Sequence, residues 1–211
     1  MSSPQLKKNV VALDRTGRDV TLLEGLFSRR SVSPKRMVGP GPDEGELRQI
    51  VAAAVTAPDH CALRPWRFIH IHSDALGLLG DVFAEIKARR DPTCSAEALE
   101  RERARAHAAP VLIAVVARVT VGHPRVRVCE QFMSAGAAMQ NMLLCAHALG
   151  YGAKIVSGLK VLDPQLAHAL NIAADEQLAG FVCLGTQAHA PRKAARPDID
   201  DHLTVWNPRN V

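Results

Sequence analysis

Hydrophobic positions recur at helical spacing in the first quarter of the chain and predict two helices there. Apolar residues from Val20 onward predict a short amphipathic helix that ends at the basic run Ser28–Ser31. Asp43 and Glu46 stand three residues apart ahead of a second apolar stripe. This is the pattern of a capping box, so a helix should begin there and stop before Pro58.

Three later segments carry the patterns of strands. Residues 67–72 alternate, with Phe68 and His70 on one face and Ile69 and Ile71 on the other. Val111–Ala117 is a run of seven apolar residues, which predicts a central strand covered on both faces. A further short strand is expected between the glycines at 180 and 185.

Between and after these strands the pattern returns to helices. Asp74 is a candidate cap for a helix that runs to about Arg90. The longest helical segment, Arg127–Leu149, should end at Gly150. Asp163, followed by proline, predicts another helix start. Strands and helices therefore interleave, and we expect an α+β or mixed α/β fold.

Composition agrees with one folded domain. The chain has 211 residues, of which 47% are hydrophobic and 22% charged, as in ordinary globular proteins. We expect residues 1–19 to form a flexible N-terminal arm and residues 20–211 a single domain.

The charge balance argues against nucleic-acid binding. Lys and Arg number 26 against 21 Asp and Glu, a net charge of +5, and the two signs are interspersed. The charged segment Glu97–His107 is interpreted as a solvated helix face.

The cysteine spacing favours a reduced compartment, and the apolar segments argue against secretion and membrane insertion. The cysteines lie far apart, with no C-x-x-C pair, at Cys61, Cys94, Cys129, Cys145 and Cys183. The N-terminus has no apolar core of a leader peptide. Polar residues interrupt the most apolar window, Phe132–Gly150, so a buried helix is favoured over a membrane span. We expect a cytoplasmic protein without membrane contact.

Two basic segments could hold a phosphate. In Ser28–Ser33 two guanidiniums stand beside hydroxyls at a helix end, the groups that bind phosphate by charge-assisted bonds. Arg192, Lys193 and Arg196 near the C-terminus could form a second cationic arm. Taken alone, a run like the first is more often a basic surface corner than a phosphate site, and the second could equally be solvated.

Two further segments are candidates for ligand contact. Ala57–Trp66 is a turn-rich connector containing His and Cys, which we interpret as a rigid turn anchored by Trp66 rather than a Cys-His hydrolase centre. Residues Gly152–Gly158 are predicted to form a glycine-containing loop that could approach a ligand closely. The segment lacks both the dinucleotide-binding and the P-loop patterns. The nine histidines show no ligand spacing for a metal site.

Taken in order, these segments resemble the nitroreductase family of FMN-dependent flavoproteins, in particular its short single-domain members. The matching elements are Arg29-Arg30-Ser31, the A-P-x-x-x-x-x-x-P-W pattern of residues 57–66, Glu130-Gln131, Met133–Gly136, Ala148–Gly152, Ser157-Gly158 and Leu184–Thr186. The resemblance covers about Leu22 to Trp206.

The resemblance implies a nitroreductase-like fold, with a central mixed sheet flanked by helices, in a homodimer that holds FMN at the subunit interface. Its phosphate positions would be Arg29, Arg30, Ser31, Lys193 and Arg196. The turn meeting the flavin from the partner subunit would include Thr56, Pro58, Asp59 and His60. The loop over the flavin ring would be Ile155, Val156, Ser157 and Gly158. No catalytic side chain and no metal is implied.

The implied activity is an NAD(P)H oxidoreductase that passes hydride through FMN to a nitroaromatic, quinone or similar small acceptor in a ping-pong cycle. Ala62, Arg64 and Val156 depart from residues common in the family, so the acceptor is not implied. The alternative is a flavin-binding or redox-sensing protein without efficient turnover.

The helix at 127–149 also motivates the dimer. Its small residues Ser134–Ala138 permit close helix approach, while Met139, Met142 and Leu143 offer apolar bulk that a single domain would not readily cover. We therefore expect a two-fold axis near this helix.

Overall fold

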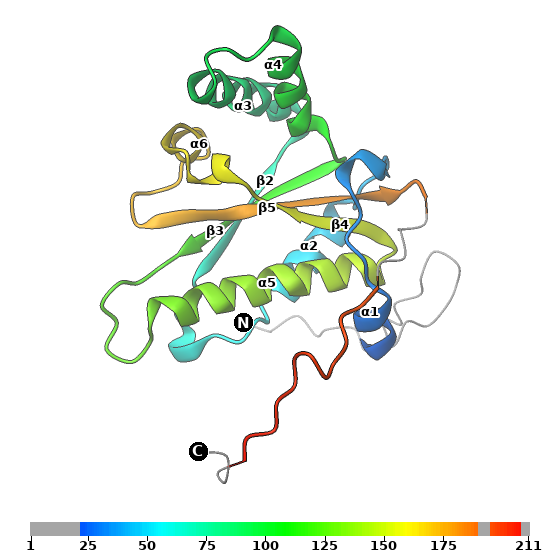
Figure 1. Cartoon of the computed structure of the whole chain (residues 1–211), viewed down its shortest axis with the longest axis vertical. Helices are drawn as coiled ribbons and strands as arrows, with labels where there is room; N and C mark the ends of the chain where they lie inside the picture. Colours follow the sequence, from blue (N-terminus) through cyan, green and yellow to red (C-terminus); the bar gives the residue numbers. More distant parts are fainter. Residues whose placement is uncertain (1–21, 190–194, 208–211) are drawn as a thin grey trace, which may run out of the picture.

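The computed structural model describes residues 22–189 and 195–207, and a five-stranded sheet lies at its centre (Figure 1). The strand order is β1-β5-β3-β2, and β4 also pairs with β5. The strands are β1 (Met37–Val38), β2 (Trp66–Ile71), β3 (Val111–Arg118), β4 (Tyr151–Val156) and β5 (Glu176–Gln187).

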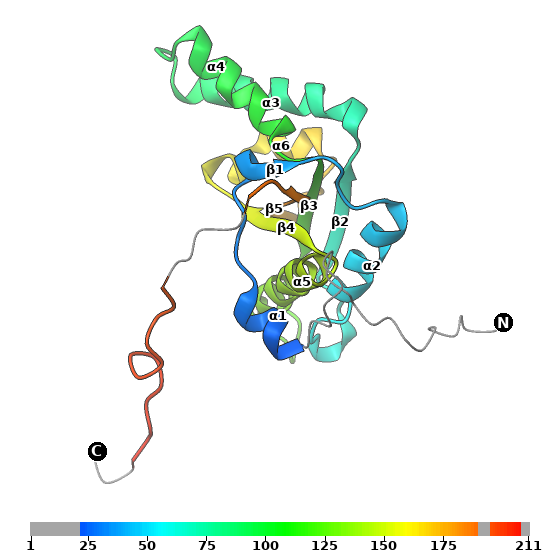
Figure 2. The same ribbon diagram turned by 90° about the vertical axis from the view of Figure 1, so that its right-hand side faces the viewer.

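Helices cover both faces of this sheet. They are α1 (Leu22–Ser28), α2 (Glu44–Ala54), α3 (Leu76–Arg90), α4 (Ala96–Arg103), α5 (Val128–Ala148) and α6 (Pro164–Ala169). Short 3-10 turns are η1 (Pro34–Arg36), η2 (His60–Ala62), η3 (Ser73–Ala75), η4 (Ala104–His107) and η5 (Leu159–Leu162). α1, α2 and α5 lie on one face, and α3, α4 and α6 on the other (Figures 1 and 2).

The α+β class is confirmed, whereas the mixed character expected of the sheet is nearly absent. Every pair of named strands is antiparallel. Within the described ranges, the parallel component is an isolated bridge between Ser31 and Ala153.

The central strand is β3, as its apolar run predicts. β3 lies between β2 and β5 and alternates between two cores. Leu112, Ala114 and Val116 pack under α3, while Ile113 and Val115 pack under α2 and α5. A strand buried on both faces needs no polar positions, which explains the unbroken run.

Several predicted element boundaries are confirmed. Asp43 caps α2 through a capping box with Glu46. α5 spans nearly the predicted range, and the chain leaves it through Gly150 at φ 84°, a conformation that glycine adopts without steric cost. None of the described helices is both long and apolar enough to cross a bilayer.

Two local predictions are wrong. Asp74 does not cap α3, because it lies in η3 and its carboxylate contacts Nδ1 of His72 at 2.9 Å. Most of the predicted loop Gly152–Gly158 belongs to β4. Gly152 serves packing there, since a Cβ at this position would lie 3.1 Å from the Val32 side chain.

The apolar bulk of α5 is already covered within the chain, which contradicts the reason given above for a dimer axis. Ala138 and Met142 are fully buried, and Met139 and Leu143 nearly so, in the core shared with α2 and the sheet. Met133 is the most exposed large apolar residue of this helix, with 68% of its surface accessible to solvent.

Asp163 is the buried carboxylate that fixes the segment after β4. It caps α6 by accepting from the Gln165 amide at 3.1 Å, and it pairs with Arg89 at 2.5 Å and Arg90 at 3.2 Å. Burial by itself would raise the pKa of Asp163, but the bonds from Arg89 and the Gln165 amide and the charge of Arg90 lower it.

We expect Asp163→Ala to lower the free energy of unfolding at neutral pH by about 2 kcal/mol, through loss of the cap and of a buried partner. A lowered carboxyl pKa contributes stability above its unfolded-state value and loses it as the pH falls through the folded-state value. The deficit measured by urea unfolding should therefore shrink in acid. A deficit that stays constant down to pH 3 would contradict this assignment.

Candidate functional site

A cationic corner forms where α1 ends. Arg196, from the segment after β5, donates from Nη2 to the carbonyls of Phe27 at 3.2 Å and Arg29 at 2.9 Å. Arg30 donates from Nη1 to the same Phe27 carbonyl at 3.0 Å. The structure thus brings together predicted phosphate-binding residues from opposite ends of the sequence.

In the part of the chain that the structure describes, Arg29 has no counter-charge in this corner. Its Nη1 is buried without a hydrogen-bond partner. Burial, followed by the charges of Arg196 and Arg30, lowers the pKa of Arg29. Within residues 22–189 and 195–207, no carboxylate forms an ion pair with any of these three arginines. Buried charges are normally paired, so the corner is suited to an anion.

His147, which the sequence analysis did not single out, lies beside this corner. Its Nε2 is 2.8 Å from Oγ of Ser28. Burial and the nearby charge of Arg29 lower the pKa of His147, which favours the neutral imidazole. The signal that could have found it is its position in the last turn of α5, a helix that packs against α1.

Ser31 connects the corner to β4. It forms the parallel bridge with Ala153, and the Val32 amide donates to the Ala153 carbonyl at 3.1 Å. From Ala153 the strand runs three residues, about 10 Å, to Val156, beyond which Ser157 and Gly158 are exposed. The phosphate positions and the predicted ring loop therefore lie along one strand of one chain.

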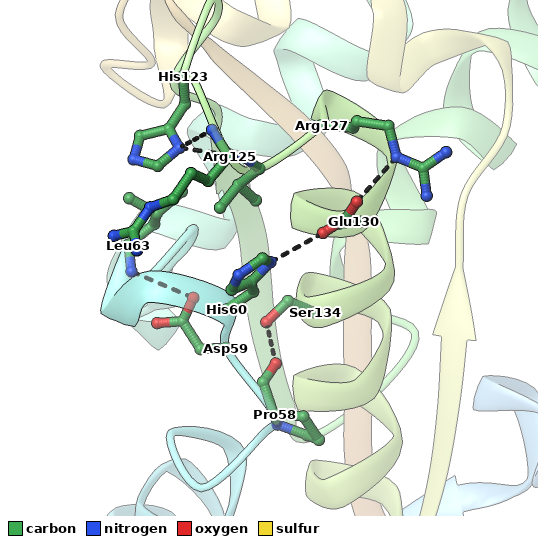
Figure 3. A network of polar contacts seen from close by, with 10 residues as sticks. Pro58, Asp59, His60, Leu63, His123, Arg125, Arg127, Glu130 and Ser134 are labelled. Carbon is green, nitrogen blue, oxygen red and sulfur yellow. Dashed lines mark hydrogen bonds and ion pairs between the residues drawn. The ribbon is translucent and has the colours of Figure 1, made fainter.

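The turn at Pro58–His60 forms the second part of the candidate site (Figure 3). Oγ of Ser134, on α5, donates to the Pro58 carbonyl. The Asp59 carboxylate accepts from the amides of Leu63 at 3.2 Å and Arg64 at 2.7 Å. These bonds hold a backbone in which Cys61, Ala62 and Arg64 have φ values of 64°, 51° and 50°. Positive φ at three non-glycine residues is strained, and such strain gathers at functional sites.

Two charged residues at the start of α5, Glu130 and Arg127, orient the His60 ring. Its Nδ1 lies 3.1 Å from one oxygen of Glu130, whose other oxygen accepts from Nε of Arg127 at 2.8 Å (Figure 3). Hydrogen bonds from Arg127 and His60 lower the pKa of Glu130. The His60 side chain is 55% exposed, so its ring is held in one orientation and is still accessible to a ligand.

Thr56 belongs to the base of the same turn. Its hydroxyl donates to the Ala53 carbonyl at 2.8 Å and lies 3.3 Å from Nδ2 of Asn141 on α5. Thr56 therefore ties the end of α2 to α5.

The two parts of the predicted site do not meet within one chain. Pro58 and His60 contact α5 at Ser134 and Glu130, and Thr56 contacts it at Asn141, whereas the cationic corner contacts it at His147. Thirteen residues of helix separate Ser134 from His147, about 20 Å along the axis. Lys193 lies outside the described residues.

Comparison with known proteins gives one consistent result. A model of the family described as "Nitroreductase family" matches residues 26–186. The chain is 34% identical over 187 residues to the Escherichia coli (strain K12) protein named "Putative NAD(P)H nitroreductase YdjA", with 87% of this chain and 98% of that protein covered.

Solved structures share the fold. A nitroreductase-like family protein from Bacillus cereus superimposes with a TM-score of 0.73 at 20% identity, covering 88% of this chain and 96% of that one. A structure from Desulfovibrio desulfuricans, described as a "putative nitroreductase in complex with fmn", superimposes with a TM-score of 0.67 at 25% identity, covering 88% and 97%.

Proposed function

The chain belongs to the nitroreductase family, and on that premise we propose that it is an FMN-dependent oxidoreductase. It takes hydride from NADH or NADPH and passes it to a nitroaromatic, quinone or similar small acceptor in a ping-pong cycle. The relative named as an NAD(P)H nitroreductase and the FMN complex of a similar structure support this proposal at the level of the family.

The observation that carries the proposal is the unpartnered Nη1 of Arg29. A buried guanidinium nitrogen beside two further arginines, with its pKa lowered, favours occupation by a phosphate group. The donor set fits a monophosphate, because a phosphate accepts charge-assisted bonds from Arg29 and from the Ser31 hydroxyl.

FMN, when bound, supplies the hydride chemistry through its ring. Arg29, Ser31 and Arg196 would hold its phosphate. The segment Val156–Gly158, in which Val156 is half-buried and Ser157 and Gly158 are exposed, would border the ring, with the amides of Ser157 and Gly158 as donors towards it. We assign no side chain a proton-transfer role in this reaction.

We further propose that the protein works as a homodimer in which the Pro58–His60 turn of one subunit completes the site of the other. The distance between the two parts of the site in one chain supports this arrangement. So do the exposed apolar side chains of α1, where Leu22, Leu23 and Phe27 are 74%, 64% and 73% exposed, because exposed apolar patches mark interaction sites.

The C-terminal segment adds a second reason. Beyond Arg196, residues 197–207 run away from the sheet and its helices (Figures 1 and 2). The segment carries Val205 at 85% and Trp206 at 78% exposure. Apolar side chains on such a protruding segment are stabilised by burial against a partner.

We expect the purified protein to be yellow and to release FMN, not FAD, on heating, because the cationic corner suits one phosphate and no adenine-binding pattern exists in the sequence. Visible absorbance and chromatography of the released flavin measure this outcome. A colourless protein that gains no flavin absorbance on incubation with FMN would refute the proposal.

Turnover separates the enzyme from the flavin-binding sensor. Oxidation of NADH or NADPH should depend on an added nitroaromatic or quinone. Bound FMN without acceptor-dependent turnover would favour the sensor instead. A cytoplasmic location stays a prediction from the sequence.

A further inference from the structure

A cavity of about 150 Å³ lies between the sheet and the helical layer of α3 and η4, at the end of β4. Val156 and Ser157 line it, so it borders the proposed ring loop. Apolar walls come from Phe83, Leu112 and Phe181. A cavity of about this size, lined by apolar side chains, holds one benzene ring.

The inner wall of the cavity consists of two packed aromatic rings and a protonated thiol. Phe83 and Phe181 pack edge to face, with ring centroids 6.0 Å apart. Cys183 also lines the cavity, but burial raises the pKa of its thiol to about 11, so the sulfur is neutral and not a nucleophile at neutral pH. The interior is therefore suited to binding a ring, not to reacting with it.

The polar wall carries a net positive charge. Glu102 contacts Nε of Arg105 at 3.1 Å and Nζ of Lys160 at 2.8 Å. Lys160 also lies 3.9 Å from the centre of the Phe83 ring. One carboxylate thus faces two cations, both of which line the cavity, and one positive charge remains. The Arg105 side chain is 63% exposed, so it lines the cavity from the solvent side.

We propose that this cavity binds the aromatic ring of the electron acceptor, and that Arg105 selects acceptors with an anionic substituent such as a carboxylate. The inference rests on the proposed function, because Val156 and Ser157 border both the cavity and the position proposed for the flavin ring. The sequence analysis treated Arg105 as part of a solvated helix face, and no local pattern there separates it from its neighbours.

The test uses benzoate and benzamide, which have the same ring and shape but differ in charge and contain no reducible nitro group. We expect calorimetric titration of the FMN-loaded protein to show benzoate binding about tenfold more tightly than benzamide, since a charge-assisted bond at an exposed arginine is only partly screened. Arg105→Ala should abolish this preference and Arg105→Lys should restore part of it.

The matched control is Arg103→Ala. Arg103 pairs with Asp81 and Glu100 on the surface and does not line the cavity, so this variant should keep the preference for benzoate. The proposal is overturned if neither compound binds, if both bind equally, or if the preference survives Arg105→Ala. It is also overturned if Arg29→Ala, and not Arg105→Ala, removes the preference, because benzoate would then occupy the cationic corner.

Failure of the proposed function gives a different result. The visible spectrum reports FMN independently of benzoate. A protein without flavin whose preference for benzoate depends on Arg105 would retain the cavity site and lose its assignment to an electron acceptor.

Discussion

Replacing Arg29 by alanine should lower the affinity for FMN about thirtyfold, or about 2 kcal/mol, because the variant removes directed bonds to the phosphate. The same substitution should not lower the free energy of unfolding of the flavin-free protein. In that state Nη1 of Arg29 is buried without a partner, and Arg30 and Arg196 repel its charge. Fluorescence titration of the apoprotein with FMN and urea unfolding without FMN measure the two effects.

Arg103→Ala is again the control, because it removes the same charge from a guanidinium that already has two carboxylate partners. Its effect on FMN affinity should stay within about twofold, as for an exposed ion pair. Equal losses for the two variants would indicate a diffuse electrostatic effect and no phosphate site at Arg29. A large loss of apoprotein stability in Arg29→Ala would mean that Arg29 serves the fold instead.

Elements whose sequence pattern reflects a single local cause were predicted well. The capping box at Asp43 and Glu46 needs contacts within one turn. The apolar run of β3 follows from its burial on both faces. In both cases the residues that determine the structure are the residues that carry the pattern.

Elements whose structure depends on distant partners were not predicted. β4 contains glycine and lysine and reads as a loop, but β5 pairs with all six of its residues. The sequence of α5 predicts more apolar surface than one domain would cover, but in the structure α2 and the sheet cover it. In the candidate site, the meeting of Arg196 with α1 links residues 167 and 169 positions apart, which no local pattern specifies.

These corrections also change how a dimer should be tested. Ala138 is fully buried beside α2, so a charge introduced there would disrupt the core of one subunit and would say nothing about assembly. A better test uses the separation of the Pro58–His60 turn from the cationic corner. If the two parts of a site come from different subunits, a dimer of two different variants can still contain one intact site.

Mixing two defective variants should restore FMN binding if each site combines the cationic corner of one chain with the turn of another. Arg29→Ala damages the corner, and the double substitution Asp59→Ala/His60→Ala damages the turn. A hybrid dimer of the two then holds one site with both defects and one intact site. Random exchange makes half of the dimers hybrid, so about a quarter of all sites should recover, as two-fold symmetry requires.

The matched control mixes Arg29→Ala with Arg196→Ala, two variants of the same corner. Every site of that hybrid carries one damaged corner, so its FMN content should stay at the level of the parents. Flavin absorbance per chain after coexpression measures both mixtures, and circular dichroism checks that each parent folds. If the first mixture recovers no more flavin than the second, each site lies within one chain, and the Pro58–His60 turn has no part in binding the partner's flavin.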